Sequence, residues 1–237
     1  MDRIKIYGLQ KLTLLDYPGR LACTVFLGGC NFRCPWCHNG PLVLTDGTSV
    51  LMSVGELLGF LESRKGRLQG VCISGGEPTL YPTLPRLIRE IRSLGFEVKL
   101  DTNGTNPEML RSLIDEGLVS YVAMDIKNSI EKYPATVGLA SCEGNSLSVI
   151  EGVKKSAELL MEGRVDFEFR TTLMQELHTA EDMDAIGRWL AGGEKYFLQT
   201  YRDEGDLLVG GFTPFTAEQT RGLLKRIREY ILNAEIR

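Results

Sequence analysis

Short runs rich in valine, isoleucine and aromatic residues alternate with helical patterns along almost the whole chain. The runs typical of strands are LACTVFL, VCIS, FEVKLD, VSYVAMDIK, VDFEFRTTL and YFLQTY. A strand followed by a helix, six times over, predicts parallel strands whose crossover helices cover the sheet. Six units are too few for a closed eight-fold barrel. Two α/β architectures remain from the pattern, an open doubly wound sheet and a partial, open barrel.

The segments between these runs carry the signals at which helices begin and end. Ser53 with Glu56 forms a capping box, and Thr216 opens a predicted C-terminal helix at about 216–234. No low-complexity segment, long linker or exact repeat interrupts the pattern. We therefore expect a single domain over residues 1–237.

Composition excludes some functional classes. The formal net charge of -4 argues against non-specific binding of nucleic acid, which needs a basic excess. The N-terminal segment MDRIKIYGLQKLTLLDYPGR has no apolar run of the kind found in signal peptides, and no later segment is apolar enough to span a membrane. We expect a cytoplasmic protein, in which thiols stay reduced.

A polar cluster follows each predicted strand. In both candidate architectures ligands bind at the carboxyl ends of parallel strands, so these clusters are expected to share one rim. The clusters are the cysteine-rich loop 28–40, Ser74 to Pro78, Asp101 to Gly104, Met124 to Lys127, Arg170 to Thr172, and Gln199 to Arg202.

The loop GGCNFRCPWCHN holds Cys30, Cys34 and Cys37 within eight residues. Thiolates select zinc or iron–sulfur chemistry. A structural zinc site needs four closed ligands, and the only candidate for a fourth is His38, which follows Cys37 without a spacer. An iron–sulfur cube normally takes four thiolates. Three thiolates on one loop can hold three irons and leave the fourth open to an exogenous ligand, which suggests chemistry rather than structure.

Two other uses of the cysteines are considered. Cys34-Pro35-Trp36-Cys37 alone is also a CxxC motif of thiol–disulfide oxidoreductases, although this interpretation leaves Cys30 and the other rim clusters without a role. The remaining cysteines are expected to be small packing residues. They are Cys23, Cys72 and Cys142.

At this point the motifs resemble a known family. CxxxCxxC with an aromatic residue before its last cysteine, followed by GGEP at the end of the next strand, resembles the radical S-adenosylmethionine (SAM) enzymes. LDYPGRLACTVFLGGCNFRCPWCHN, ISGGEPTL, KLDTNG, VAMDIK and FRTT together resemble the glycyl-radical-enzyme activases. Among these, the anaerobic ribonucleoside-triphosphate reductase activating proteins are the most similar, and the pyruvate formate-lyase activating enzymes share several motifs. The resemblance covers nearly the whole chain and implies a partial (β/α)6 barrel.

The resemblance also implies a reaction. Cys30, Cys34 and Cys37 would hold a [4Fe–4S] cluster whose fourth iron binds S-adenosylmethionine. An electron from a reduced flavodoxin or ferredoxin would cleave this cofactor to methionine and a 5′-deoxyadenosyl radical. The radical would abstract hydrogen from a backbone glycine of a partner enzyme. The alternatives are a radical enzyme that modifies a small molecule and, in another class, a thiol-redox or electron-transfer module built on CPWC.

The resemblance assigns cofactor contacts to the strand ends and, from the two aspartate segments, suggests a monovalent cation. The implied contacts are Trp36 beside the adenine, Gly75, Gly76 and Glu77 at the methionine amino group, Asp101, Thr102 and Asn103 along the methionine and ribose, Asp125 and Lys127 at the fourth strand end, and Arg170 near the cofactor carboxylate.

Three further positions lie outside these contacts. Where pyruvate formate-lyase-type relatives have a histidine, this chain has Tyr201-Arg202, so a contact with the adenosine is not expected there. Asp16 matches a position near the peptide substrate of the relatives. His178 is expected to be a loop or helix-cap residue.

Overall fold

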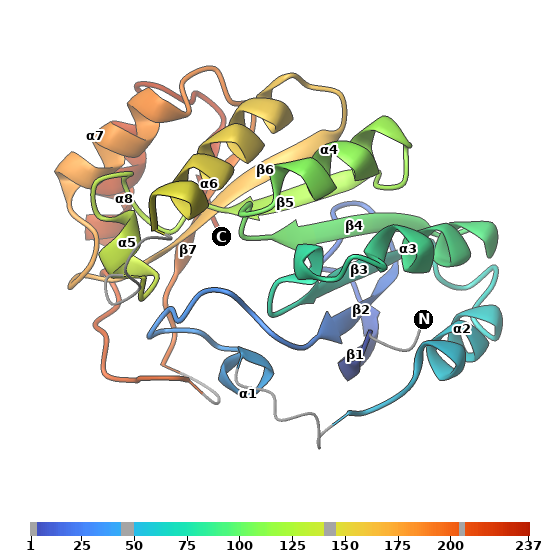
Figure 1. The fold of residues 1–237 in the computed structure, drawn as a ribbon. Helices are drawn as coiled ribbons and strands as arrows, with labels where there is room; N and C mark the ends of the chain where they lie inside the picture. Colours follow the sequence, from blue (N-terminus) through green and yellow to red (C-terminus); the bar gives the residue numbers. More distant parts are fainter. Residues whose placement is uncertain (1–3, 44–49, 140–145, 204–206) are drawn as a thin grey trace.

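One curved sheet organises the protein (Figure 1). The computed structural model describes residues 4–43, 50–139, 146–203 and 207–237. In this part of the chain, eight strands follow one another across the sheet in the order of the sequence. They are β1 (Ile6–Thr13), β2 (Ala22–Leu27), β3 (Gly70–Gly75), β4 (Glu97–Thr102), β5 (Tyr121–Asp125), β6 (Asp166–Leu173), β7 (Tyr196–Thr200) and β8 (Ala234–Ile236).

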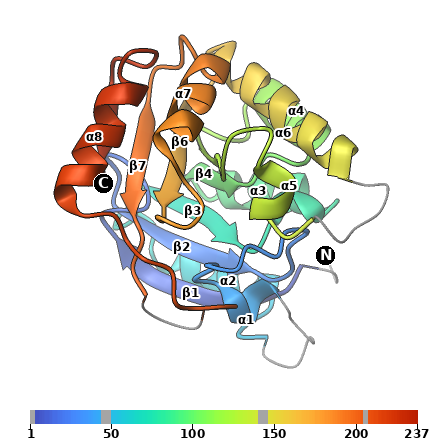
Figure 2. The same cartoon turned by 90° about the vertical axis from the view of Figure 1, so that its left-hand side faces the viewer.

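The strands from β2 to β8 are parallel, and only β1 runs antiparallel to its neighbour. The longer helices lie on the outer, convex side of the sheet (Figures 1 and 2). The helices are α1 (Gly40–Val43), α2 (Val54–Glu62), α3 (Leu84–Ser93), α4 (Pro107–Asp115), α5 (Tyr133–Thr136), α6 (Ser146–Met161), α7 (Ala180–Trp189) and α8 (Ala217–Ile227), with a short 3-10 helix at Pro78–Leu80.

The barrel is open. In the described part of the chain, β1 and β8 end the sheet at opposite edges and do not pair with each other. The six strands expected from the sequence correspond to β2 through β7. The sequence therefore predicted the parallel centre of the sheet correctly, and the structure decides for the partial barrel.

The two edge strands were not expected. The prediction of a C-terminal helix over about 216–234 was too long, because α8 ends at Ile227 and is followed by turns and β8. Ala234 pairs with Tyr196 of β7. Pairing with the edge of the sheet overrides the helical pattern of these residues. A strand of only three residues is too short to be recognised from its sequence, because its pairing depends on a distant part of the chain.

Local signals placed the helix starts well. The capping boxes at Ser53 and Thr216 form as predicted, and a third forms at Thr179; in each, the side chain three residues later bonds back to the cap backbone. The residues of the sheet that face the helices are apolar and fully buried, for example Val25 and Ile73. This packing fixes the positions of the strand ends, and with them the loops that follow.

The concave face of the sheet is polar instead. Lys99 and Glu168 are both buried there, and Glu168 accepts a hydrogen bond from the Tyr121 hydroxyl at 2.9 Å.

Cys23 and Cys72 are fully buried, as expected for packing residues, whereas Cys142 lies outside the described residues. Within the described ranges, no helix is both long and apolar enough to cross a bilayer.

Candidate active site at the strand ends

The cysteine loop is tied by its backbone to the end of β3. The amide of Gly76 donates to the carbonyl of Leu27 at 2.9 Å, and the amide of Glu77 donates to the carbonyl of Gly29 at 2.8 Å. A Cβ atom on Gly76 would lie 1.9 Å from the Gly29 oxygen, and Gly75 adopts a φ of 121°. Glycine is therefore required at both positions because two backbones meet there.

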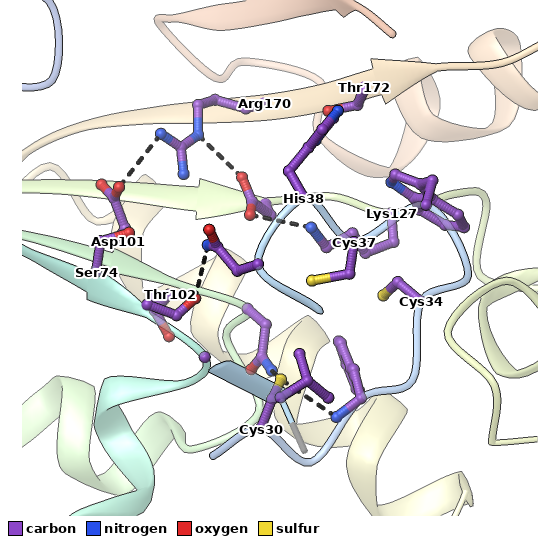
Figure 3. A pocket seen from close by; sticks show the side chains of 18 of the residues that line it. Cys30, Cys34, Cys37, His38, Ser74, Asp101, Thr102, Lys127, Arg170 and Thr172 are labelled. Carbon is purple, nitrogen blue, oxygen red and sulfur yellow. Dashed lines mark hydrogen bonds and ion pairs between the residues drawn. The ribbon is translucent and has the colours of Figure 1, made fainter. Parts of the chain in front are cut away.

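The three thiols of the loop face one cavity. Figure 3 shows the sulfur atoms of Cys30, Cys34 and Cys37 turned toward the same space, with Arg170 and Asp101 across it. Cys30 Sγ accepts hydrogen bonds from the Phe32 amide at 3.4 Å and from Asn103 Nδ2 at 3.9 Å. Such N–H donors favour a sulfur that carries negative charge.

The donor set fits an iron–sulfur cluster better than a single ion. Among the described residues, no three His, Cys, Asp or Glu side chains gather closely enough to hold one metal ion. A cube spreads its thiolates over separate irons, so wider spacing of Cys30, Cys34 and Cys37 suits it. Burial raises the pKa of Cys30 to about 11 and that of Cys34 to about 12. Forming the two thiolates therefore costs free energy, and binding to iron would offset that cost.

The CPWC segment lacks the setting of a redox-active dithiol. Pro35 and Trp36 form a turn, and the amide of Cys37 donates to the carbonyl of Cys34 at 3.1 Å. Helix α1 begins only at Gly40, so Cys34 does not lie at a helix N-terminus, where a thiol pKa would be lowered. The thiol-redox alternative therefore loses its usual physical basis.

The cavity has a volume of about 240 Å³ and lies between the loop and the ends of the parallel strands. It brings together all the site residues expected from the sequence except Glu77. Its lining also includes seven residues that were not assigned a contact. They are Phe32, His38, Asn39, Val43, Ser74, Thr172 and Gln199.

A sequence signal existed for three of these seven. Ser74, Thr172 and Gln199 lie at strand ends, and Thr172 pairs with Gln199 across β6 and β7. Thr172 is two residues beyond Arg170, so the two-residue period of a strand places both on one face. The other four lie on the cysteine loop or α1, where no regular period applies.

Glu77 lies behind the cavity wall. Its side chain is fully buried, and its carboxylate accepts four hydrogen bonds. The donors are the Thr79 amide at 3.0 Å and hydroxyl at 2.5 Å, the Thr102 hydroxyl at 2.7 Å and the Asn103 amide at 2.6 Å. Burial raises the pKa of Glu77, while these donors favour the carboxylate. The geometry makes Glu77 a clamp between the GGEP and DTNG segments.

Alternating charges form a row along one cavity wall. Arg170 joins two carboxylates, with Nε 2.9 Å from Asp125 Oδ1 and Nη1 3.6 Å from Asp101 Oδ2. Lys127 Nζ lies 3.0 Å from Asp125 Oδ2, and Lys99 Nζ contacts Asp101 Oδ1. Burial alone would raise the pKa of Asp125, but the neighbouring cations outweigh it and lower the pKa to about 2.

The row does not fit the monovalent cation that the resemblance suggests. Each of the four carboxylate oxygens of Asp101 and Asp125 already contacts a nitrogen of a protein cation. An added cation would lie beside those positive groups.

His178 lies in the loop between β6 and α7, as the sequence predicted, and its buried ring also supports this wall. It is 1% exposed, and Nδ1 accepts a hydrogen bond from the Met174 amide at 3.2 Å. Nε2 therefore carries the proton and donates to the Lys127 carbonyl at 3.0 Å. Burial lowers the pKa of His178, which keeps the ring neutral. Its partner is 51 residues away, so no local pattern revealed this role.

The chain after β7 covers the cysteine loop. The Val209 amide donates to the Pro35 carbonyl at 2.7 Å, and the Trp36 ring stands edge-on to Phe212 with a centroid distance of 6.3 Å. Trp36 is only 3% exposed but still lines the cavity. Tyr201 is buried and does not line it.

Asp16 lies outside the cavity lining. One carboxylate oxygen accepts a hydrogen bond from the Thr24 hydroxyl of β2 at 2.5 Å.

Comparisons with known proteins indicate one family. The Radical SAM superfamily model matches residues 24–160. The chain is 31% identical over 235 residues to a Methanocaldococcus jannaschii protein whose name assigns it to the glycyl-radical enzyme activating enzymes, covering 98% of this chain and 95% of that protein. It is 38% identical over only 89 residues to the 7-carboxy-7-deazaguanine synthase of Neisseria meningitidis, covering 38% and 39%.

Among solved structures, Streptococcus suis SuiB bound to S-adenosylmethionine superposes with a TM-score of 0.66 at 14% identity. The match covers 88% of this chain and 48% of that chain. At such low identity the likeness concerns the fold alone.

Proposed function

This chain belongs to the radical SAM superfamily, and from that premise we propose that it is an activating enzyme that installs a glycyl radical on a partner enzyme. The observation that carries the proposal is the cavity itself, in which three thiols of one loop face a wall of paired cations and carboxylates. The full-length similarity to a protein named as a glycyl-radical enzyme activating enzyme supports it.

Cys30, Cys34 and Cys37 would hold a [4Fe–4S] cluster. Bound together, this cluster and S-adenosylmethionine supply a one-electron reductive cleavage that yields methionine and a 5′-deoxyadenosyl radical. The protein itself binds and orients the reactants and excludes side reactions. Asn103 and the Phe32 amide direct N–H groups at Cys30 Sγ, which stabilises negative charge on that sulfur.

The charged wall suits the carboxylate of the cofactor. Lys99, Lys127 and Arg170 contribute three positive charges against the two negative charges of Asp101 and Asp125, so the row carries a net charge of +1. A net positive, partly desolvated site attracts a carboxylate strongly.

The neutral lining would contact the rest of the cofactor. Gly75 and Gly76 would present their backbone to its amino group. We assign the adenine and ribose to Trp36, Thr102 and Asn103, which all line the cavity.

Because the barrel is open, a peptide segment of a partner would reach the cavity from the side. Residue motifs favour anaerobic ribonucleoside-triphosphate reductase as that partner, with a pyruvate formate-lyase-type enzyme as the alternative. A reduced flavodoxin or ferredoxin would supply the electron. We propose that this reaction takes place in the cytoplasm.

An anaerobic assay tests the proposal. The protein is reconstituted with iron and sulfide, reduced, and given S-adenosylmethionine, and 5′-deoxyadenosine is quantified. We expect turnover that is lost in Cys34→Ala and retained in Cys23→Ala, a matched cysteine that is buried on β2 outside the cavity lining. Adding the reductase should then produce a glycyl radical detectable by EPR.

The local similarity to 7-carboxy-7-deazaguanine synthase supports a second candidate, a radical enzyme acting on a small molecule. This candidate predicts a modified small-molecule product in the absence of any protein partner. A well-formed cluster without cofactor cleavage would contradict both candidates and favour an electron-transfer module.

A further inference from the structure

Lys99 is a buried cation at the start of the KLDTNG motif, and no role at the site was predicted for it. It lies on the concave face of β4 and is 1% exposed. Its ammonium group contacts Asp101 Oδ1 and lies 3.9 Å from Cys72 Sγ and 6.0 Å from the centre of the Tyr121 ring. A buried ammonium group is costly unless it is paired, so Lys99 and Asp101 depend on each other.

Arg170 completes the pairing of the second oxygen of Asp101. Its guanidinium group uses Nη1 on Asp101 and Nε on Asp125, which leaves Nη2 without a protein partner among the described residues. The remaining carboxylate oxygen, Asp125 Oδ2, forms an ion pair with Lys127. Each aspartate is thus held between two side-chain cations.

We propose that Lys99 and Arg170 are built-in counter-ions of the cofactor site, so that S-adenosylmethionine binds without a soluble monovalent cation. The inference rests on the placement of the cofactor in the cavity proposed above. An inorganic cation between the two aspartates would stand beside three positive groups in a poorly hydrated site. The protein supplies the same charge from side chains that are already ordered by their ion pairs.

The role of Lys99 is that of a positioning residue acting through Asp101. Lys99 is absent from the cavity lining, whereas Asp101 is part of it. Replacing Lys99 by methionine keeps the length and apolar body of the side chain but removes its charge. The net charge of the row falls from +1 to 0, and Asp101 Oδ1 becomes free to take a soluble cation.

Binding to the oxidised holoenzyme tests the inference without turnover. The reconstituted protein is titrated anaerobically with S-adenosylmethionine by calorimetry, in potassium and in tetramethylammonium buffers of equal ionic strength. We expect the two dissociation constants to agree within about twofold. Tightening by potassium of about tenfold or more in the wild-type protein would overturn the inference.

Two variants separate this role from a purely structural one. In Lys99→Met we expect binding to weaken by about tenfold in tetramethylammonium and to recover in potassium. Lys65→Met is the matched control, because it removes an exposed lysine paired with Glu62 at the end of α2, and it should behave as the wild type in both buffers. Thallium(I), a probe for potassium, should give a bound NMR signal only in Lys99→Met.

A folded Lys99→Met that binds the cofactor equally in both buffers would show that Lys99 only supports the fold, and would overturn the inference. If that variant fails to fold, the comparison of wild-type binding in potassium and in tetramethylammonium buffers still tests the inference. Cofactor cleavage and glycyl-radical formation are measured separately, so ion dependence would refute this inference while leaving the proposed activase function standing.

Discussion

Replacing Glu77 by glutamine distinguishes a clamp from a cofactor ligand. The substitution preserves the shape of the side chain but turns one carboxylate oxygen into an N–H donor. In the wild-type protein the Asn103 amide donates to Oε2 of Glu77 at 2.6 Å. If the amide nitrogen of the glutamine takes the place of Oε2, two N–H donors face each other and this hydrogen bond is lost. The three donors at Oε1 then bond to a neutral oxygen instead of a charged one.

The expected cost follows from these contacts. Hydrogen bonds to a charged group contribute roughly 1.5–3 kcal/mol each, and neutral ones about 1 kcal/mol. One hydrogen bond is lost and leaves a buried amide unsatisfied, and the other three hydrogen bonds become weaker. Because glutamine is neutral, the variant no longer bears the cost of burying a charge, which offsets part of this loss. We expect the free energy of unfolding to fall by about 2–4 kcal/mol. For a chain of this size, that lowers the midpoint of thermal unfolding by roughly 5–15 °C.

The assay is urea and thermal unfolding of the apoprotein, followed by circular dichroism. Glu62→Gln is the control, because its exposed ion pair with Lys65 is worth at most about 0.5 kcal/mol. Binding of S-adenosylmethionine to the reconstituted proteins is measured in parallel. If Glu77→Gln unfolds like the wild type but no longer binds the cofactor, Glu77 contacts the cofactor directly and the clamp argument is wrong.

Three further substitutions have defined outcomes. Gly76→Ala would set a Cβ 1.9 Å from the Gly29 oxygen, so we expect the purified variant to incorporate little iron and sulfide; full incorporation would contradict this. Arg237→Met leaves the buried Glu168 without its bidentate partner and should lower the free energy of unfolding by about 3 kcal/mol, measured in urea. Because burial lowers the pKa of His178, the unfolded chain binds a proton first as the pH falls, so apoprotein stability should decline below about pH 6.5. His178→Gln should flatten that decline in urea titrations, and an unchanged slope would refute the assignment.

Much of the site was predictable because local patterns place it. Alternating strand and helix signals predicted the parallel strands, and parallel strands bring their carboxyl ends to one edge. Cys30, Cys34 and Cys37 stood out through their spacing alone, whereas Arg170 was predicted through the resemblance to the family. The capping boxes likewise depend only on residues three apart.

Other features of the site depend on partners that are distant in the sequence. Glu77 follows the glycines of its motif, yet it is buried against the Asn103 amide, 26 residues further along. Lys99 looks like an ordinary strand residue until Asp101 and the concave face surround it. The edge strand β8 and the buried ring of His178 likewise exist only through long-range pairing.

The sequence by itself determined which side chains reach the rim, because strand period, helix caps and parallel connections are local properties of the chain. Only the tertiary structure decided which of those side chains face the cavity and which hold one another. That division depends on burial and on distances of a few ångströms between charges and donors, and both arise only when the strands lie side by side.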